Sequence, residues 1–271
     1  AAQSNIFECT RKTTEAMAFW QRRHSFMLDR FLLGAGITPA DALEKIDIES
    51  VEDGALYALS LPETAGRREV FNVETRTKET RVFDGIRRRP GWIGCGMSYK
   101  YLCQSALKSG AKQFTIMEDD ALLPPDHLRN MEIVSQYLEE NDGNWDIFSG
   151  VIAHLHDDAN VIDVKNFGGL DFITIDRMTS TVFNIYSRRA MSCISEWNQS
   201  NCDALTNTID RYLENSGLRI VVTDPFLVGH REEMHSTLWG FQNTQYRDMI
   251  AESQRQLRFI KEQWRSRISF D

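Results

Sequence analysis

The feature that most limits the fold is an alternation of short apolar runs and longer amphipathic segments between residues 54 and 240. Runs with the length of strands lie at residues 55–61, 113–117, 146–151, 181–186 and 218–222. Apolar residues recur at helical spacing in residues 98–108, 127–140, 188–197 and 203–215. Strands that alternate with helices favour a mainly parallel sheet with helices on its faces, so we expect an α/β fold.

The two ends of the chain have a different pattern. Residues 1–53 have large apolar side chains at helical spacing, and residues 241–271 read as one charged amphipathic helix. We therefore expect three parts: an N-terminal helical segment at 1–53, an α/β domain at 54–240 and a C-terminal helix at 241–271. The N-terminal helices could pack on the chain's own sheet or dock to another domain or subunit.

Composition excludes several classes of protein. The chain has 271 residues and a formal net charge of -8, which argues against a general nucleic-acid binder. No run approaches the roughly 20 apolar residues of a membrane span. The five cysteines are scattered and form no Cys-x-x-Cys pair, a pattern typical of reduced thiols in a cytosol-like compartment. We expect a cytoplasmic protein without a membrane span.

The strongest functional signal is an apolar run that ends in three carboxylates. Residues 113–117 read as a buried strand, and Glu118, Asp119 and Asp120 follow directly. Such carboxylates cannot be buried without a cation or other partners, and α/β sheets bind ligands at the carboxyl ends of their strands. Their oxygens suit a divalent ion that also binds substrate phosphates. The alternative is a solvated acidic turn before a helix, since residues 124–126 resemble a helix start.

Several blocks of sequence occur in an order that resembles a known family. They lie at residues 57–68, 83–85, 91–98, 118–120, 145–147, 181–188, 208–210 and 225–236. The ordered set is similar to glycosyltransferase family 25, which includes lipopolysaccharide-type sugar transferases and collagen galactosyltransferases. The resemblance covers roughly residues 54–240. Ser98-Tyr99 departs from the family, which usually has Ser-His at this point.

The resemblance implies a GT-A fold, a nucleotide-sugar donor, a divalent metal and inverting transfer. In that arrangement Asp120 is the first metal ligand and Asp119 a second, while Glu118 reaches the ribose or orders the turn. Mn²⁺ and Mg²⁺ both favour such oxygen-rich sites, so either would serve. GT-A enzymes often add a histidine ligand from a late loop. We favour His235 over His230, because His235 lies in the family-like Met-His-Ser sequence at residues 234–236.

Inverting transfer also needs a base that deprotonates the acceptor hydroxyl. Asp210 is the best candidate by its position in the motif. An alternative role for Asp210 is a helix-surface carboxylate that pairs with Arg211 or Arg188. Asp203, which resembles a helix N-cap, is a weaker candidate for the base.

Three further features could contribute to binding. Arg67 and Arg68 could contact the nucleotide or its phosphates, or form a solvated basic turn. Gly94 would allow a ligand to approach the backbone closely, or would suit a tight helix entry. The His-x-His-Asp-Asp sequence at residues 154–158 could bind zinc, although no further ligands complete such a site. We expect it to be part of a loop on the acceptor side.

Together these features predict a metal-dependent inverting glycosyltransferase. The resemblance implies that it moves a hexose, galactose or glucose, from a UDP-sugar to a hydroxyl of a glycan or glycoconjugate acceptor. A metal-dependent nucleotidyltransferase or phosphohydrolase could use the same acidic strand end, although the sequence has no P-loop or Gly-x-Gly-x-x-Gly cradle. A non-catalytic carbohydrate-binding or scaffold module is the other alternative.

Overall fold

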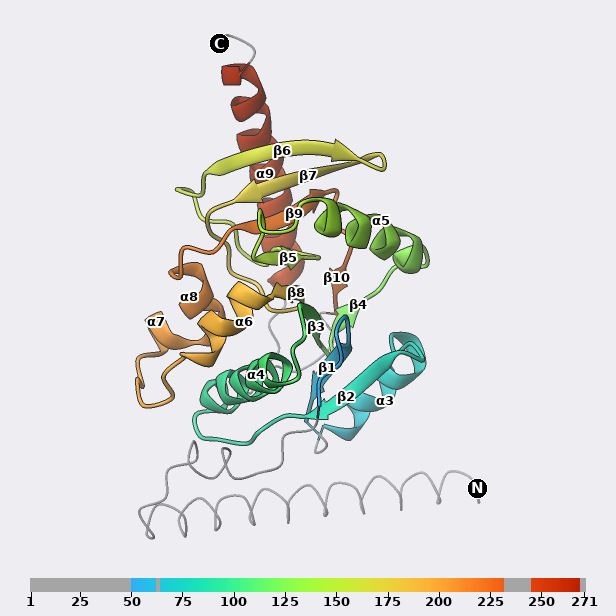
Figure 1. The fold of residues 1–271 in the computed structure, drawn as a ribbon, viewed down its shortest axis with the longest axis vertical. Coiled ribbons are helices and arrows are strands. Elements are labelled where there is room, and N and C mark those ends of the chain that lie inside the picture. The colour runs from blue at the N-terminus through green and yellow to red at the C-terminus, as the bar shows by residue number, and fades with distance from the viewer. Residues whose placement is uncertain (1–49, 62–63, 232–244, 269–271) are drawn as a thin grey trace.

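A computed structural model describes residues 50–61, 64–231 and 245–268 of the chain. Within these residues, eight strands form one sheet in the order β2-β1-β3-β8-β5-β9-β7-β6 (Figure 1). Its strands are β1 (Leu56–Ser60), β2 (Thr80–Asp84), β3 (Gln113–Glu118), β5 (Ile147–Ser149), β6 (Val161–Phe167), β7 (Leu170–Ile175), β8 (Phe183–Ser187) and β9 (Ile220–Asp224). A separate two-stranded sheet pairs β4 (Ala121–Leu122) with β10 (Gly229–His230).

The helices that accompany the sheet are α3 (Ala65–Glu74), α4 (Gly91–Lys108), α5 (His127–Glu140), α6 (Arg188–Ser195), α7 (Ala204–Asn207), α8 (Ile209–Glu214) and α9 (Tyr246–Ile268). No described helix has the length and apolar character of a membrane span. The cysteines in the described residues, Cys95, Cys103, Cys193 and Cys202, are free.

Strand direction confirms the expected mostly parallel sheet. β1 pairs in parallel with β2 and β3, and β5 pairs in parallel with β9. β8 lies antiparallel between β3 and β5, and β7 lies antiparallel between β9 and β6. With β7 and β8 reversed, the other six of the eight strands run in one direction.

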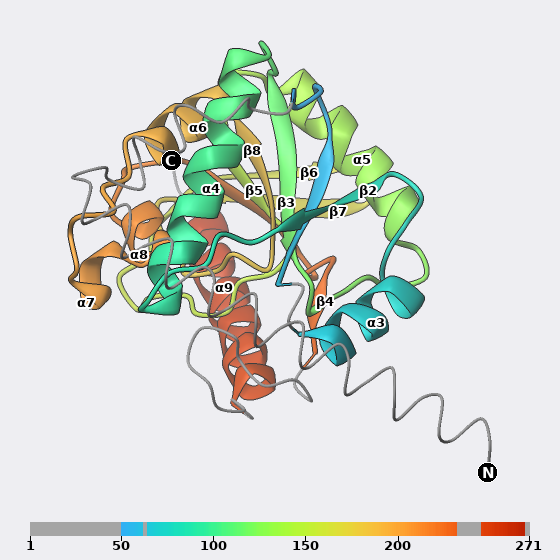
Figure 2. The same ribbon diagram turned by 90° about the horizontal axis from the view of Figure 1, so that it is seen from below.

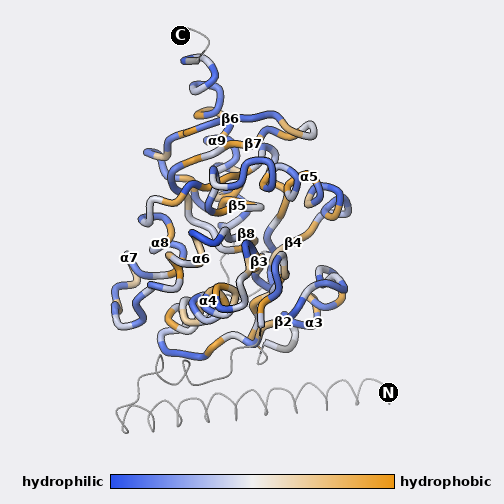
Figure 3. The backbone as a smooth tube through the Cα atoms, viewed as in Figure 1, coloured by the Kyte–Doolittle hydropathy of each residue, from blue (hydrophilic) through white to orange (hydrophobic). Residues whose placement is uncertain are grey.

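The alternation of side chains along each strand builds a core on both faces of the sheet. On one face, Phe114 and Ile116 of β3 pack with residues of α4, α6 and α8. On the opposite face, Met117 and Phe148 pack with residues of α3 and α5. Figure 2 shows these two helix groups on either side of the sheet. Hydrophobic residues are concentrated in α4 and the central strands, whereas α9 is mainly hydrophilic (Figure 3).

The expected strands correspond to β1, β3, β5, β8 and β9, and the expected helices to α4, α5, α6 and the α7–α8 pair. Asp203 is an N-cap as predicted, since its side chain accepts a hydrogen bond from Leu205 N. The prediction missed α3, β2 and the β6–β7 hairpin. β2 and β6 are the edge strands of the sheet, and their partly exposed, charged sequences lack a continuous apolar run.

The helix expected at the C-terminal end is α9, which packs on the sheet through the fully buried Leu257. It contacts β6 and β9, so this helix covers the strands farthest from β2.

The expectations for the N-terminal helices and for His235 fall on residues outside the described part of the chain. The domain boundaries at residues 53 and 240 remain predictions.

Candidate functional site at the end of strand β3

The three carboxylates lie at the carboxyl end of β3, as the sequence predicts. Glu118 is the last residue of β3, and Asp119 and Asp120 form the turn that leads into β4. Asp119 is 3% exposed and Asp120 is 6% exposed. The alternative of a solvated acidic turn is therefore wrong. Burial of two aspartates requires partners that compensate for the water they lose.

Two hydroxyl groups, one at the end of β1 and one just before β8, donate hydrogen bonds to Asp119 and Glu118. Ser60, at the end of β1, donates a hydrogen bond to Asp119 Oδ2 at 2.6 Å. Thr181 donates from Oγ1 to Glu118 Oε1 at 2.6 Å. The carbonyl of Thr181 accepts a hydrogen bond from the hydroxyl of Tyr99 at 3.2 Å. Tyr99, the departure from the family pattern, thus supports the residue that holds Glu118.

Arg67 is the main cationic partner of Asp119 and Asp120. Its Nε bonds Asp119 Oδ1, and its Nη2 lies 2.5 Å from Asp120 Oδ2. Burial alone would lower the pKa of Arg67, but Asp120 and Asp119 outweigh it and hold that pKa above its ordinary value. Of the two alternatives for Arg67, the solvated basic turn is wrong, and contact with a nucleotide remains a prediction. The residue belongs to the first turn of α3, and that helix directs it toward the carboxylates.

His230 contacts the same oxygen of Asp120 as Arg67 does. It belongs to β10, where it pairs with Ala121 of β4, and its Nε2 lies 3.3 Å from Asp120 Oδ2. The ring of Tyr246, at the start of α9, lies 4.5 Å from the imidazole between centroids. Burial lowers the pKa of His230, but the hydrogen bond and charge of Asp120 raise it above its ordinary value. The structure therefore brings His230 to the site, whereas His235 lies outside the described residues.

The carboxylates differ in their tendency to hold a proton. Burial, together with the charge of Asp120, raises the pKa of Glu118 to about 7. Burial also raises the pKa of Asp119, although Arg67 opposes the shift. Burial acts the same way on Asp120, yet the hydrogen bond from His230 and the charge of Arg67 outweigh it and lower its pKa. Asp120 is thus the carboxylate most strongly held in its charged form.

The atoms of the site fit a divalent cation in part. Asp120 Oδ1 and His230 Nδ1 are buried and have no hydrogen-bond partner in the described residues. The carboxylate oxygen suits Mn²⁺ or Mg²⁺, whereas His230 Nδ1 lies on the side of the imidazole ring opposite the Nε2 that contacts Asp120. Among residues 50–61, 64–231 and 245–268, however, no group of three or more His, Cys, Asp or Glu could hold a metal ion. Substrate phosphates and water would have to complete the coordination, as is usual for Mg²⁺.

Asp210 lies in the first turn of α8, a helix that contacts α4. Burial raises the pKa of the Cys95 thiol, and the charges of Glu118 and Asp210 raise it further. In the described residues, Arg211 forms its ion pair with another carboxylate, and Arg188 donates to a backbone carbonyl. The alternative pairing of Asp210 with these arginines is not formed. Its role as a base remains a prediction.

Arg68 and Gly94 have structural roles. Arg68 lies 2.6 Å from Asp84 at the end of β2. A Cβ atom at Gly94 would lie 2.2 Å from the carbonyl oxygen of Ile86, so only glycine permits this close packing of α4 on the preceding loop. The tight helix entry considered for Gly94 is therefore present. Direct contact of Arg68 or Gly94 with a nucleotide remains a prediction.

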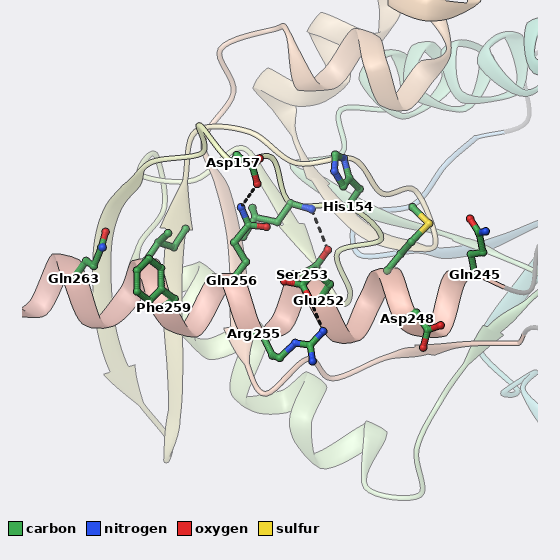
Figure 4. A pocket seen from close by; sticks show the side chains of 13 residues that line it. His154, Asp157, Gln245, Asp248, Glu252, Ser253, Arg255, Gln256, Phe259 and Gln263 are labelled. Carbon is green, nitrogen blue, oxygen red and sulfur yellow. Dashed lines mark hydrogen bonds and ion pairs between the residues drawn. The ribbon is translucent and has the colours of Figure 1, made fainter.

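In the segment 154–158, His156 and Asp158 form ion pairs with different residues elsewhere in the fold. His156 Nε2 lies 2.7 Å from Glu214 Oε1, and Asp158 pairs with Arg177 at 2.8 Å. Beside this segment, an open groove of about 950 Å³ runs along α9 (Figure 4). None of the carboxylates at the end of β3 lines this groove. The described structure thus gives no zinc site at residues 154–158.

Comparison with known proteins leaves the family open. No family model and no curated protein sequence matches the chain. Among solved structures, A197 from STIV aligns with a TM-score of 0.35 and 9% identity, covering 63% of this chain and 81% of that chain. Mannose-1-phosphate geranyltransferase from Thermus thermophilus aligns with a TM-score of 0.33 and 10% identity, covering 61% of this chain and 58% of that chain. Similarity at this level supports no functional conclusion, so function is inferred from the site.

Proposed function

We propose that this protein is a metal-dependent inverting glycosyltransferase that uses a nucleotide-sugar donor. The observation that supports the proposal is the buried pair Asp119 and Asp120 at the carboxyl end of a central parallel strand, with Arg67 and His230 beside it. This end of an α/β sheet is where phosphate-bearing ligands bind. Membership of family 25, the GT-A fold, and UDP-galactose or UDP-glucose as donor rest on the sequence resemblance.

The proposed residue roles follow from the chemistry of the reaction. Asp120, with Asp119, would hold Mn²⁺ or Mg²⁺. The bound ion would neutralise the charge that develops on the diphosphate leaving group. Arg67 would bind a phosphate oxygen of the donor, because a guanidinium matches phosphate geometry.

Asp210 would accept the proton of the acceptor hydroxyl. The acceptor oxygen then forms a bond to C1 of the sugar from the face opposite the nucleotide. The bond from C1 to the phosphate oxygen breaks, and the diphosphate leaves with its electron pair. The acceptor is a hydroxyl of a glycan or glycoconjugate in this proposal.

A thermal-shift screen of UDP-sugars, each with and without Mn²⁺, tests the proposal. A ligand at 100 times its Kd stabilises the folded state by about 2.7 kcal/mol, which raises the Tm of a domain of this size by about 5 °C or more. We expect a Mn²⁺-dependent shift with one donor. Asp120→Asn should abolish that shift, whereas Asp163→Asn, on the edge strand β6, should retain it.

The products then separate the alternatives. Sugar transfer to an added acceptor supports a glycosyltransferase. Release of phosphate or UDP without transfer indicates a phosphohydrolase, and formation of a nucleotide sugar from a sugar phosphate and UTP indicates a nucleotidyltransferase. A donor-dependent shift that needs no Mn²⁺ contradicts the metal assignment, and binding without turnover favours a carbohydrate-binding module.

A further inference from the structure

The cation Arg67 already occupies the carboxylates that the proposed function assigns to a metal. Arg67 bonds Asp119 and Asp120 at the same time, and its side chain is only 10% exposed. Both oxygens of Asp119 are already engaged, because Oδ1 accepts from Arg67 and Oδ2 accepts from Ser60. On Asp120, Oδ2 is engaged and Oδ1 is the oxygen without a partner. A metal that takes this place on the two aspartates must displace Arg67, because the guanidinium bonds both carboxylates and two cations repel each other.

Withdrawal of Arg67 is costly unless another anion receives it. A buried arginine without a counter-charge is strongly destabilising. The first turn of α3 contains no acidic residue, and the positive end of the helix dipole adds to the repulsion felt by Arg67 there. A diphosphate, in contrast, offers a guanidinium the same paired oxygens that the two aspartates provide.

We propose that Arg67 is an internal counter-ion that blocks metal binding until a nucleoside diphosphate arrives. It holds Asp119 and Asp120 in the free protein, and it moves to the diphosphate when the metal takes its place. This inference rests on the proposed function and adds an order of binding to it. Because coupling between two ligands is reciprocal, UDP raises the affinity for metal by the same factor as metal raises the affinity for UDP.

The test measures Mn²⁺ affinity in the absence of any nucleotide, by calorimetry or by electron paramagnetic resonance of free Mn²⁺. We expect Arg67→Met to bind Mn²⁺ about tenfold more tightly than the wild type, a difference of about 1.4 kcal/mol. Addition of UDP should raise the Mn²⁺ affinity of both proteins, since its phosphates can ligate the ion, but by a larger factor in the wild type, where UDP also receives Arg67. Arg76 is an exposed arginine just beyond the end of α3, and it is bonded to Asn72. The control variant Arg76→Met should therefore bind Mn²⁺ as the wild type does.

A second variant tests the inference if Arg67→Met does not fold. Arg67→Lys keeps the charge but loses the planar fork that contacts two carboxylates, so its Mn²⁺ affinity should lie between those of the wild type and the methionine variant. The gain in affinity should disappear when Asp120→Asn is added to either variant. A gain that persists with Asp120→Asn would place the metal elsewhere and overturn the inference.

Two further outcomes overturn the inference without ambiguity. One is Mn²⁺ binding in Arg67→Met or Arg67→Lys that is no tighter than in the wild type. The other is wild-type UDP binding that needs no metal and is lost in Arg67→Met, which would make Arg67 itself the cation that binds the diphosphate. Sugar transfer by the wild type distinguishes these results from failure of the proposed function, because it is measured separately from Mn²⁺ affinity.

Discussion

Replacement of Lys261 by methionine should weaken the attachment of α9 to the sheet. Lys261 is 7% exposed, and its Nζ lies 2.9 Å from Asp171 Oδ2 on β7 and 2.7 Å from Asp224 Oδ2 on β9. Methionine keeps an unbranched apolar stem of similar length and removes only the charge. The same helix begins at Tyr246, whose ring lies on His230. Loosening α9 therefore also affects one side of the candidate site.

The loss of stability in Lys261→Met depends on which cations remain beside Asp171 and Asp224. Loss of one member of a buried ion pair usually costs about 3–5 kcal/mol, because the other charge is left unpaired. Here Arg258 Nε stays 2.8 Å from Asp224, and Arg265 Nη2 stays 2.9 Å from Asp171. Each carboxylate thus keeps a cation, and we expect Lys261→Met to lower the free energy of unfolding by about 2 kcal/mol. For a domain of this size that is a fall in Tm of about 4–8 °C.

Urea unfolding followed by circular dichroism measures this change, with Arg255→Met as the control. Arg255 lies on the same helix, and its side chain is 72% exposed and pairs with Glu252. An exposed pair contributes little, so the control should stay within about 0.5 kcal/mol of the wild type. A loss of stability in Lys261→Met no larger than in Arg255→Met would refute the assignment of Lys261 as a buried link between α9 and the sheet.

The contacts of Lys261 with Asp171 and Asp224 also make the free energy of unfolding depend on pH. Burial raises the pKa of Asp224 and Asp171, but their hydrogen bonds and nearby cations outweigh it and hold both below their ordinary value. A depressed pKa stabilises the fold above the unfolded value of about 3.9, and the contribution is lost as the pH falls through the folded value. The stability difference between the wild type and Lys261→Met should therefore be constant from about pH 5 to 8 and shrink below about pH 4.

Two further substitutions test the core and the reaction. Gly96→Ala should lower the free energy of unfolding by about 2–3 kcal/mol, because its Cβ would lie 2.4 Å from the buried ring of Trp197. Gly66→Ala, where no heavy atom lies within 4 Å, is the matched control in urea unfolding and should not be destabilised. Asp210→Asn should reduce the rate of transfer by about 10² to 10⁴ while leaving the donor affinity unchanged. Equal losses of rate and affinity would instead give Asp210 a structural role.

Much of the central sheet could be predicted from sequence because buried strands leave a local signal. β3 is covered by helices on both faces, and its apolar run from Phe114 to Met117 ends where the carboxylates begin. The edge strands β2 and β6 face solvent in part, so polar residues interrupt their pattern. α3 was missed for a related reason. Within its charged sequence, Phe71 is the fully buried residue, which is too little for a helical period to stand out.

The sequence by itself determined the α/β class and the position of Glu118, Asp119 and Asp120 at a strand end. Both depend on residues that are neighbours in the chain, where periodicity and charge can be read directly. Only the tertiary structure decided that Arg67 would meet the aspartates, across separations of 52 and 53 residues, and that His230 would reach Asp120. These contacts exist because β1 pairs with β3 and β10 pairs with β4. Strand pairing depends on packing of the whole sheet, and no local pattern in the chain encodes it.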